Sequence, residues 1–177
     1  MRPDPIHIKD LLPKERYEEL VSYLKGKDRS TLDWSDGFGR FHISNDPFLD
    51  KLAEELTPIA REVFGSSTLL PSYTLGSIYA GSQAQLWKHR DDNACTYTLD
   101  LCVWSNTPWD LWVEGKPYTA VENEAVAFWG NDQEHWREAF PDPANNEVAV
   151  IFFHFVEPDH WYFVHGPQYL QVIRAGK

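Results

Sequence analysis

The strongest constraint on the fold is a change of pattern near residue 67. From there to residue 156, short runs rich in β-branched, aromatic and other apolar residues alternate with Gly, Pro, Asn and Asp, which is typical of strands joined by turns. The runs are residues 68–81, 94–104, 110–115, 116–121, 124–130 and 147–156. Strands this short, numerous and evenly spaced favour a double-sheet jelly roll or barrel, because no helix alternates with them as in a doubly wound sheet.

The first third of the chain has a helical pattern instead. Apolar residues recur at helical spacing in the segment 12–24, and Gly26 ends it. A second helix is expected from Pro47 to the residue before Gly65, with a kink or break at Pro58. The chain of 177 residues suits one domain, with an α+β, mainly β fold in which N-terminal helices pack on one sheet. We expect helical support in 1–66, a jelly-roll core in 67–157 and a C-terminal tail in 158–177.

Charge and composition disfavour several classes of protein. The formal net charge of −11, from 27 acidic and 16 basic residues, makes nucleic acid an improbable partner because the far field repels phosphate. No stretch approaches the roughly 18 apolar residues of a membrane span. Cys95 and Cys102 are about 20 Å apart in one extended strand, too far for an internal disulfide. Reduced thiols and the lack of an apolar leader predict a cytoplasmic protein.

One short motif carries metal chemistry. His89 and Asp91 form an H-x-D in "LWKHRDD", at the junction of two predicted strands, where side chains at i and i+2 share a face. The motif alone is weak evidence, because seven His and 27 acidic residues give roughly one such match by chance. His135 in "QEHWREAF" follows after about four short strands, which is enough chain to return to the same end of a small barrel.

Two imidazoles and one carboxylate on one side of a metal leave three coordination positions open. That arrangement suits non-haem Fe(II) and its oxygen chemistry, whereas zinc favours tetrahedral N and S ligand sets. We consider the other histidines near the C-terminus as metal ligands as well. His154 lies in an apolar strand, typical of a core or pocket histidine, and Asp159, His160 and His165 provide a possible surface cluster.

These residues resemble the Fe(II)- and 2-oxoglutarate-dependent dioxygenases, in particular the prolyl-hydroxylase-like branch. The lead-in "YAGSQAQLWKHRD" is similar to the family's Y-x-x-G…L…H-x-D, here with Tyr79, Gly81, Leu86, His89 and Asp91. The later segment "SNTPWDLWVEGKPYTAVENEAVAFWGNDQEHWREAF" is similar to the turn, hairpin and distal-histidine strand of these enzymes. The resemblance covers about residues 11–157 and its pairing of motifs is similar to a bacterial and phage-type subgroup.

The resemblance implies a double-stranded β-helix with His89, Asp91 and His135 as iron ligands and catalytic residues. It implies 2-oxoglutarate as co-substrate, with O2, and hydroxylation of an amino acid, peptide or protein side chain with release of succinate and CO2. The family places a basic residue about where Val148 stands here. Arg137, with Tyr79, is the predicted substitute, and His154 or a basic residue on another strand is the alternative.

Alternation in the run 96–104 assigns further roles. Leu99, Leu101 and Val103 are expected to face the helices, and the other set to face into the barrel. Within that second set, Thr98 and Trp104 are predicted to contact the co-substrate and Asp100 a polar substrate group. Trp129 and His154 complete the predicted substrate contacts. A one-sided sheet with these polar residues facing water is the alternative.

Two other classes of protein fit parts of the pattern. A cupin-like metal enzyme would use the same barrel without 2-oxoglutarate, although such proteins usually cluster more histidines. A non-catalytic jelly-roll module could bind a sugar or a peptide through aromatic rings. Its candidate rings are Trp104, Trp109, Trp112, Trp129 and Trp136.

Overall fold

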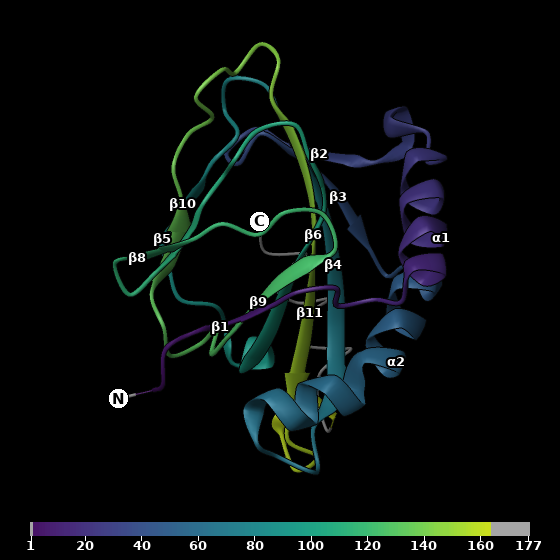
Figure 1. Cartoon of the computed structure of the whole chain (residues 1–177), viewed down its shortest axis with the longest axis vertical. Coiled ribbons are helices and arrows are strands. Elements are labelled where there is room, and N and C mark those ends of the chain that lie inside the picture. The colour runs from purple at the N-terminus through teal and green to yellow at the C-terminus, as the bar shows by residue number, and fades with distance from the viewer. Residues whose placement is uncertain (1, 164–177) are drawn as a thin grey trace.

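A computed structural model describes residues 2–163, and its predominant elements are two antiparallel β-sheets. The larger sheet lies between the two helices and the smaller sheet (Figure 1). The helices are α1 (Lys14–Lys25) and α2 (Pro47–Phe64). The larger sheet contains, in spatial order, β1 (Ile6–Ile8), β9 (Glu124–Phe128), β6 (Tyr97–Ser105), β11 (Glu147–Val156), β4 (Leu70–Ala80), β3 (Arg40–Ser44) and β2 (Asp33–Ser35). The smaller sheet contains β5 (Leu86–His89), β10 (His135–Arg137), β7 (Leu111–Val113) and β8 (Lys116–Tyr118).

The second predicted helix is confirmed with its ends in place, and it continues through Pro58 without a break. Asp46 caps α2 by accepting hydrogen bonds from the backbone N–H groups of Phe48 (3.0 Å) and Leu49 (3.2 Å). Pro47 fits the first turn because its missing N–H would have no partner there. Gly65 ends the helix in the left-handed conformation, with φ of 69°, which glycine adopts without a steric penalty.

The two faces of the larger sheet have different partners. Leu99, Leu101 and Val103 of β6 belong to the main hydrophobic core with residues of both helices, as their alternation predicts. The opposite face of the sheet looks toward the smaller sheet, where Val126 and Phe128 of β9 pack against residues of β7. The interior between the sheets is therefore a separate layer in which a pocket can form.

Trp104 departs from the predicted alternation. A β-bulge shifts the pairing of β11 with β6 between Ala149 and Val150, so that Ala149 pairs with Trp104 but Val150 with Cys102. One residue of offset moves a side chain to the other face of a sheet. Trp104 accordingly packs on the helix-side core, with Lys25 over its ring. The prediction that it faces into the barrel with Thr98 is wrong.

The hairpin of the smaller sheet follows from its turn residues. Glu114 and Gly115 have φ values of 49° and 79°, and Val113 pairs with Lys116 across this two-residue turn. Two consecutive positive φ values match the twist of the flanking strands. Among the described residues, no helix is long and apolar enough to cross a membrane.

Candidate metal centre

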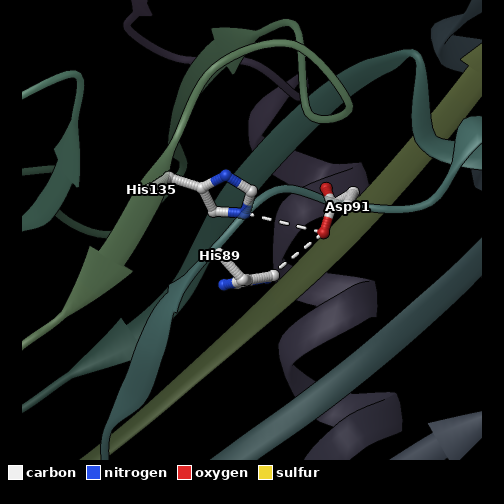
Figure 2. Close-up of side chains that lie close together, drawn as sticks. All are labelled: His89, Asp91 and His135. Atoms are coloured by element: carbon white, nitrogen blue, oxygen red, sulfur yellow. Dashed lines mark ion pairs between the residues drawn. The ribbon is translucent and has the colours of Figure 1, made fainter.

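The three predicted metal ligands come together at one end of the interior layer. His135 pairs with His89 across the antiparallel strands β10 and β5, which places the two rings side by side, with centroids 4.3 Å apart. Asp91 follows β5 by two residues, and its Oδ1 lies 3.3 Å from His89 Nε2 and 3.6 Å from His135 Nε2 (Figure 2). All three ligand atoms lie within 4.8 Å of one another.

Backbone carbonyls fix the orientation of both imidazoles. His89 Nδ1 is 2.6 Å from the carbonyl of Trp87, and His135 Nδ1 is 3.0 Å from the carbonyl of Gln133. A carbonyl oxygen can only accept, so each Nδ1 donates its hydrogen. In the neutral rings Nε2 then carries the lone pair, and it is Nε2 of each ring that faces Asp91. Such bonds orient histidine ligands in metal sites.

The Asp91 carboxylate is held ionised. Burial alone would raise the pKa of the Asp91 carboxyl, but its interactions with the neighbouring imidazoles of His135 and His89 outweigh burial and lower that pKa well below its usual value of 3.8. The side chain is 18% exposed, between His135 at 4% and His89 at 34%. The site thus opens toward solvent on the His89 side and carries the anionic ligand that a divalent cation needs.

Gly130 makes room for this carboxylate. The Asp91 N–H donates to the Gly130 carbonyl (2.9 Å), which holds the loop after β5 against the end of β9. A Cβ at residue 130 would stand 2.6 Å from Cys95 O and 2.8 Å from Thr98 Oγ1, and closer still to Asp91 Oδ2. Real Cβ atoms essentially never come within 3.0 Å of other heavy atoms, so only glycine lets the two backbones approach this closely.

A cavity of about 190 Å³ adjoins the three ligands. Four apolar side chains from four strands form much of its wall, and Tyr73, His154 and Arg40 add polar groups. The apolar residues are Leu75, Leu86, Phe128 and Phe152. A mostly apolar pocket with a few polar groups is the usual form of a small-molecule site.

Arg40 is the basic residue of this cavity that the sequence-based predictions missed. It lies on β3 opposite Tyr79 of β4, is 7% exposed, and donates from Nη1 to the Tyr79 hydroxyl (2.6 Å) and from Nε to His42 Nε2 (2.9 Å). Tyr79 does not line the cavity; it positions Arg40. The sequence feature that could have indicated Arg40 is the segment "FGRFHIS", in which an arginine interrupts a short strand-like run within a Gly-rich region.

Arg137 faces the interior as predicted but does not line the cavity. Its Nη2 donates to Asp100 Oδ2 (2.6 Å) and its Nη1 to the carbonyl of Trp109 (2.8 Å). Asp100 is 1% exposed and likewise lies outside the cavity wall. The roles predicted for these two residues would require their buried ion pair to open.

The remaining predicted contacts divide between the cavity and the core. His154 lines the cavity, and burial lowers its pKa to about 4, which keeps it neutral near pH 7. Thr98 lies behind it, with Oγ1 3.1 Å from His154 Nδ1. Trp129 lies elsewhere, edge-on to Phe64 of α2 and beneath Arg2.

The five tryptophans of the alternative binding module do not gather on one surface. Trp104 and Trp129 contact the helix side, and Trp109 is buried beside Tyr79. Trp112 and Trp136 stack on each other on the outer face of the smaller sheet. The proposed surface cluster of Asp159, His160 and His165 includes a residue outside the described part of the chain.

Comparison with known proteins supports the fold. No protein-family model and no curated protein sequence matches the chain. Among solved structures, a prolyl-4-hydroxylase from Pseudomonas putida is 15% identical, with a TM-score of 0.66, and the match covers 86% of this chain and 92% of that one. HygX from Streptomyces hygroscopicus, bound to nickel, 2-oxoglutarate and hygromycin B, is 11% identical, with a TM-score of 0.67 and coverage of 88% and 83%.

A third neighbour catalyses a different reaction. SnoN, a non-haem α-ketoglutarate-dependent epimerase from nogalamycin biosynthesis, is 9% identical, with a TM-score of 0.67 and coverage of 86% and 78%. The chain therefore has the fold of the Fe(II)- and 2-oxoglutarate-dependent oxygenases. One fold hosts several reactions, so the function has to be argued from the site.

Proposed function

We propose that this chain is an Fe(II)- and 2-oxoglutarate-dependent oxygenase that hydroxylates an amino acid, a peptide or a protein side chain. The observation that carries the proposal is the convergence of His89, Asp91 and His135 within 4.8 Å, in a fold shared with such enzymes. A two-histidine, one-carboxylate set suits non-haem Fe(II). We take the two sheets to be a double-stranded β-helix that forms the core of one domain.

The residues present fit this metal. Both Nε2 atoms face the Asp91 carboxylate, and Gly130 leaves space where a side chain would displace that carboxylate. Bound Fe(II), together with 2-oxoglutarate and O2, would supply the oxidising chemistry. Overall, 2-oxoglutarate, O2 and a substrate C–H group would give succinate, CO2 and a C–OH group.

Arg40 is our candidate for the group that binds the distal carboxylate of 2-oxoglutarate. Its guanidinium lines the same cavity as the ligand triad, and the Tyr79 hydroxyl and His42 hold it in place. A guanidinium suits a carboxylate because it presents several donors in one plane. Arg137 is the weaker candidate, since Asp100 and the Trp109 carbonyl already engage it.

The size of the cavity indicates where the substrate would lie. At about 190 Å³, the cavity is smaller than the roughly 300–1,000 Å³ of pockets for drug-sized ligands. The co-substrate would occupy much of it, so the target group would enter from the open His89 side. Trp87, 59% exposed, precedes His89 by two residues and donates from Nε1 to the Gly37 carbonyl. An extended or bulky substrate such as a peptide suits an open mouth of this kind.

One experiment tests the proposed class. Fe(II) and then 2-oxoglutarate are added to the metal-free protein without oxygen, and the visible metal-to-ligand charge-transfer band is recorded. We expect the band in the wild-type protein, and succinate after air is admitted. If neither band nor succinate is observed, the chain is not a 2-oxoglutarate-dependent oxygenase, and the cupin-like alternative would then be tested with the metal alone.

A further inference from the structure

A second group of metal-ligating atoms shares Asp91 with the triad. The ligand atoms of Asp91, Cys95 and His154 lie within 4.8 Å of one another. We infer a second metal position in this structure, which shares Asp91 with the triad and accepts a thiophilic divalent cation such as Zn²⁺, Co²⁺ or Cd²⁺. Its remaining ligands are the sulfur of Cys95 and the imidazole of His154. Because one ligand is sulfur, this position is chemically distinct from the site of His89 and His135.

Local structure holds Cys95 in place. It ends a short 3₁₀ turn (Asn93–Cys95), which Asp92 caps by accepting from the Ala94 N–H (2.8 Å). The Ser72 hydroxyl donates to the Ala94 carbonyl (2.6 Å), and this ties the turn to β4. The neighbouring backbone therefore fixes the position of the sulfur. Cys95 is 2% exposed, so a cation bound by its sulfur would be shielded from competing water.

The other two ligands are equally constrained. His154 projects from β11, and its Nδ1 lies 3.1 Å from Thr98 Oγ1, which fixes the ring orientation. Asp91 turns its Oδ1 toward the two histidines of the triad, and its Oδ2 lies on the side of Gly130 and of the Cys95 backbone carbonyl. The Asp91 carboxylate thus belongs to both candidate metal positions.

Tyr73 provides the outer support for the sulfur. Its hydroxyl lies 2.9 Å from Cys95 Sγ, and its ring packs at 4.7 Å from the ring of His154. A hydroxyl that donates to a thiolate stabilises the deprotonated form, which is the form that binds metal. Binding of the cation displaces the thiol proton from Cys95, and the Tyr73 hydroxyl can then donate to the sulfur.

The donor set determines which cation is preferred. One thiolate, one imidazole and one carboxylate are ligands typical of Zn²⁺, at metal–ligand distances of about 2.0–2.3 Å. Ligand atoms around such an ion lie roughly 3.5 Å apart, so atoms within 4.8 Å have to approach by about 1 Å. The triad of two imidazoles and one carboxylate has no sulfur and suits Fe(II) better.

Sharing of Asp91 makes the two positions interdependent. A cation bound by Cys95 and His154 draws on the carboxylate that the triad also needs, so thiophilic ions would weaken Fe(II) binding at His89 and His135. This consequence depends on the proposed function, whereas the existence of the second position does not. The position can therefore be tested with metal alone, without Fe(II), 2-oxoglutarate or substrate.

The test uses Co²⁺ added without oxygen to the metal-free protein. We expect an intense near-ultraviolet thiolate-to-Co²⁺ charge-transfer band in the wild-type protein and in His135→Ala, which disables the triad. Cys95→Ser should lose the band. Cys102→Ser is the matched control, because Cys102 is also a buried thiol on this face but is not in the cluster, and it should keep the band.

A second measurement uses the wild-type protein, so it does not depend on whether Cys95→Ser folds. ¹¹³Cd²⁺ bound to the wild-type protein should show the downfield NMR resonance of a sulfur ligand. Absence of both the charge-transfer band and this resonance would overturn the inference, as would a band that persists in folded Cys95→Ser. Failure of the Fe(II) and 2-oxoglutarate experiment would leave this result unchanged, so the two proposals fail separately.

Discussion

Gly130 lies against the carboxylate of Asp91, and its carbonyl accepts the Asp91 N–H at 2.9 Å. The contact joins the end of β9 to the loop that follows β5, so the metal-ligand loop is positioned by a strand of the other sheet. Space at residue 130 is therefore a condition for the carboxylate to face both histidines.

Gly130→Ala should weaken metal binding while the protein stays folded. The added methyl group would stand within 3.0 Å of three atoms, including Asp91 Oδ2 and Cys95 O, so the carboxylate has to move. Loss of a group that orients a metal ligand typically costs about 10- to 100-fold in affinity. Titration with Fe(II) or Co²⁺ followed by calorimetry measures the change.

The matched control is Gly37→Ala. A Cβ at residue 37 meets no atom within 4 Å, so metal affinity should equal that of the wild-type protein. Equal affinities for the two alanine variants would show that Gly130 does not position Asp91.

Arg40→Met should lower the affinity for 2-oxoglutarate without abolishing metal binding. Methionine retains much of the side-chain volume but removes the charged donors, and a hydrogen bond to a charged group is worth about 1.5–3 kcal/mol. We expect a loss of roughly 10- to 100-fold in 2-oxoglutarate affinity, measured through the charge-transfer band.

Arg90→Met is the control for Arg40→Met. Arg90 lies between the predicted ligands in the sequence, yet it is exposed and donates to the Asp132 carbonyl rather than into the cavity. Its substitution should leave 2-oxoglutarate affinity unchanged. Equal losses in both variants would indicate a general effect of positive charge rather than a carboxylate contact.

Much of the fold could be predicted because it follows from local sequence patterns. The cap and stop of α2 and the alternation of Leu99, Leu101 and Val103 are properties of a few consecutive residues. The histidine–aspartate pair could be found for the same reason. His135 could be predicted because enough chain separates it from Asp91 to return to the same end of a barrel, and because its segment resembles the distal-histidine strand of the oxygenases.

The parts that could not be predicted depend on contacts between distant segments. Trp104 changes face because of a bulge in its pairing with β11, which nothing in its own segment indicates. Arg137 pairs with Asp100 in the layer between the two sheets, and Arg40 enters the cavity because β3 pairs with β4. Alternation gives the face of a residue but not its partner across the layer.

Arg137→Met alone should destabilise the fold. The substitution leaves the carboxylate of Asp100, 1% exposed, buried without its partner, and such a change typically costs about 3–5 kcal/mol. The free energy of unfolding from urea denaturation measures it. The double variant Asp100→Leu, Arg137→Met removes both charges and should regain most of the lost stability.

The same double variant decides the role of Arg137. Because it is expected to fold, its affinity for 2-oxoglutarate can be measured without the effect of an unpaired buried charge. We expect wild-type affinity if Arg40 is the carboxylate contact. A large loss of affinity in the double variant, with none in Arg40→Met, would reverse the assignment.

Asp46 should make the stability of the helical layer depend on pH. Burial would raise its pKa, but hydrogen bonds from Lys27, Tyr23 and the Leu49 N–H outweigh it and lower the pKa below 3.8. A carboxylate with a lowered folded-state pKa stabilises the protein above its unfolded pKa, and this contribution is lost as the pH falls through the folded value. Asp46→Asn keeps a capping side chain but removes the charge. Urea denaturation at pH 7 and near pH 3 should show a smaller loss on acidification in the variant; an equal loss in both proteins would assign the acid sensitivity to other carboxylates.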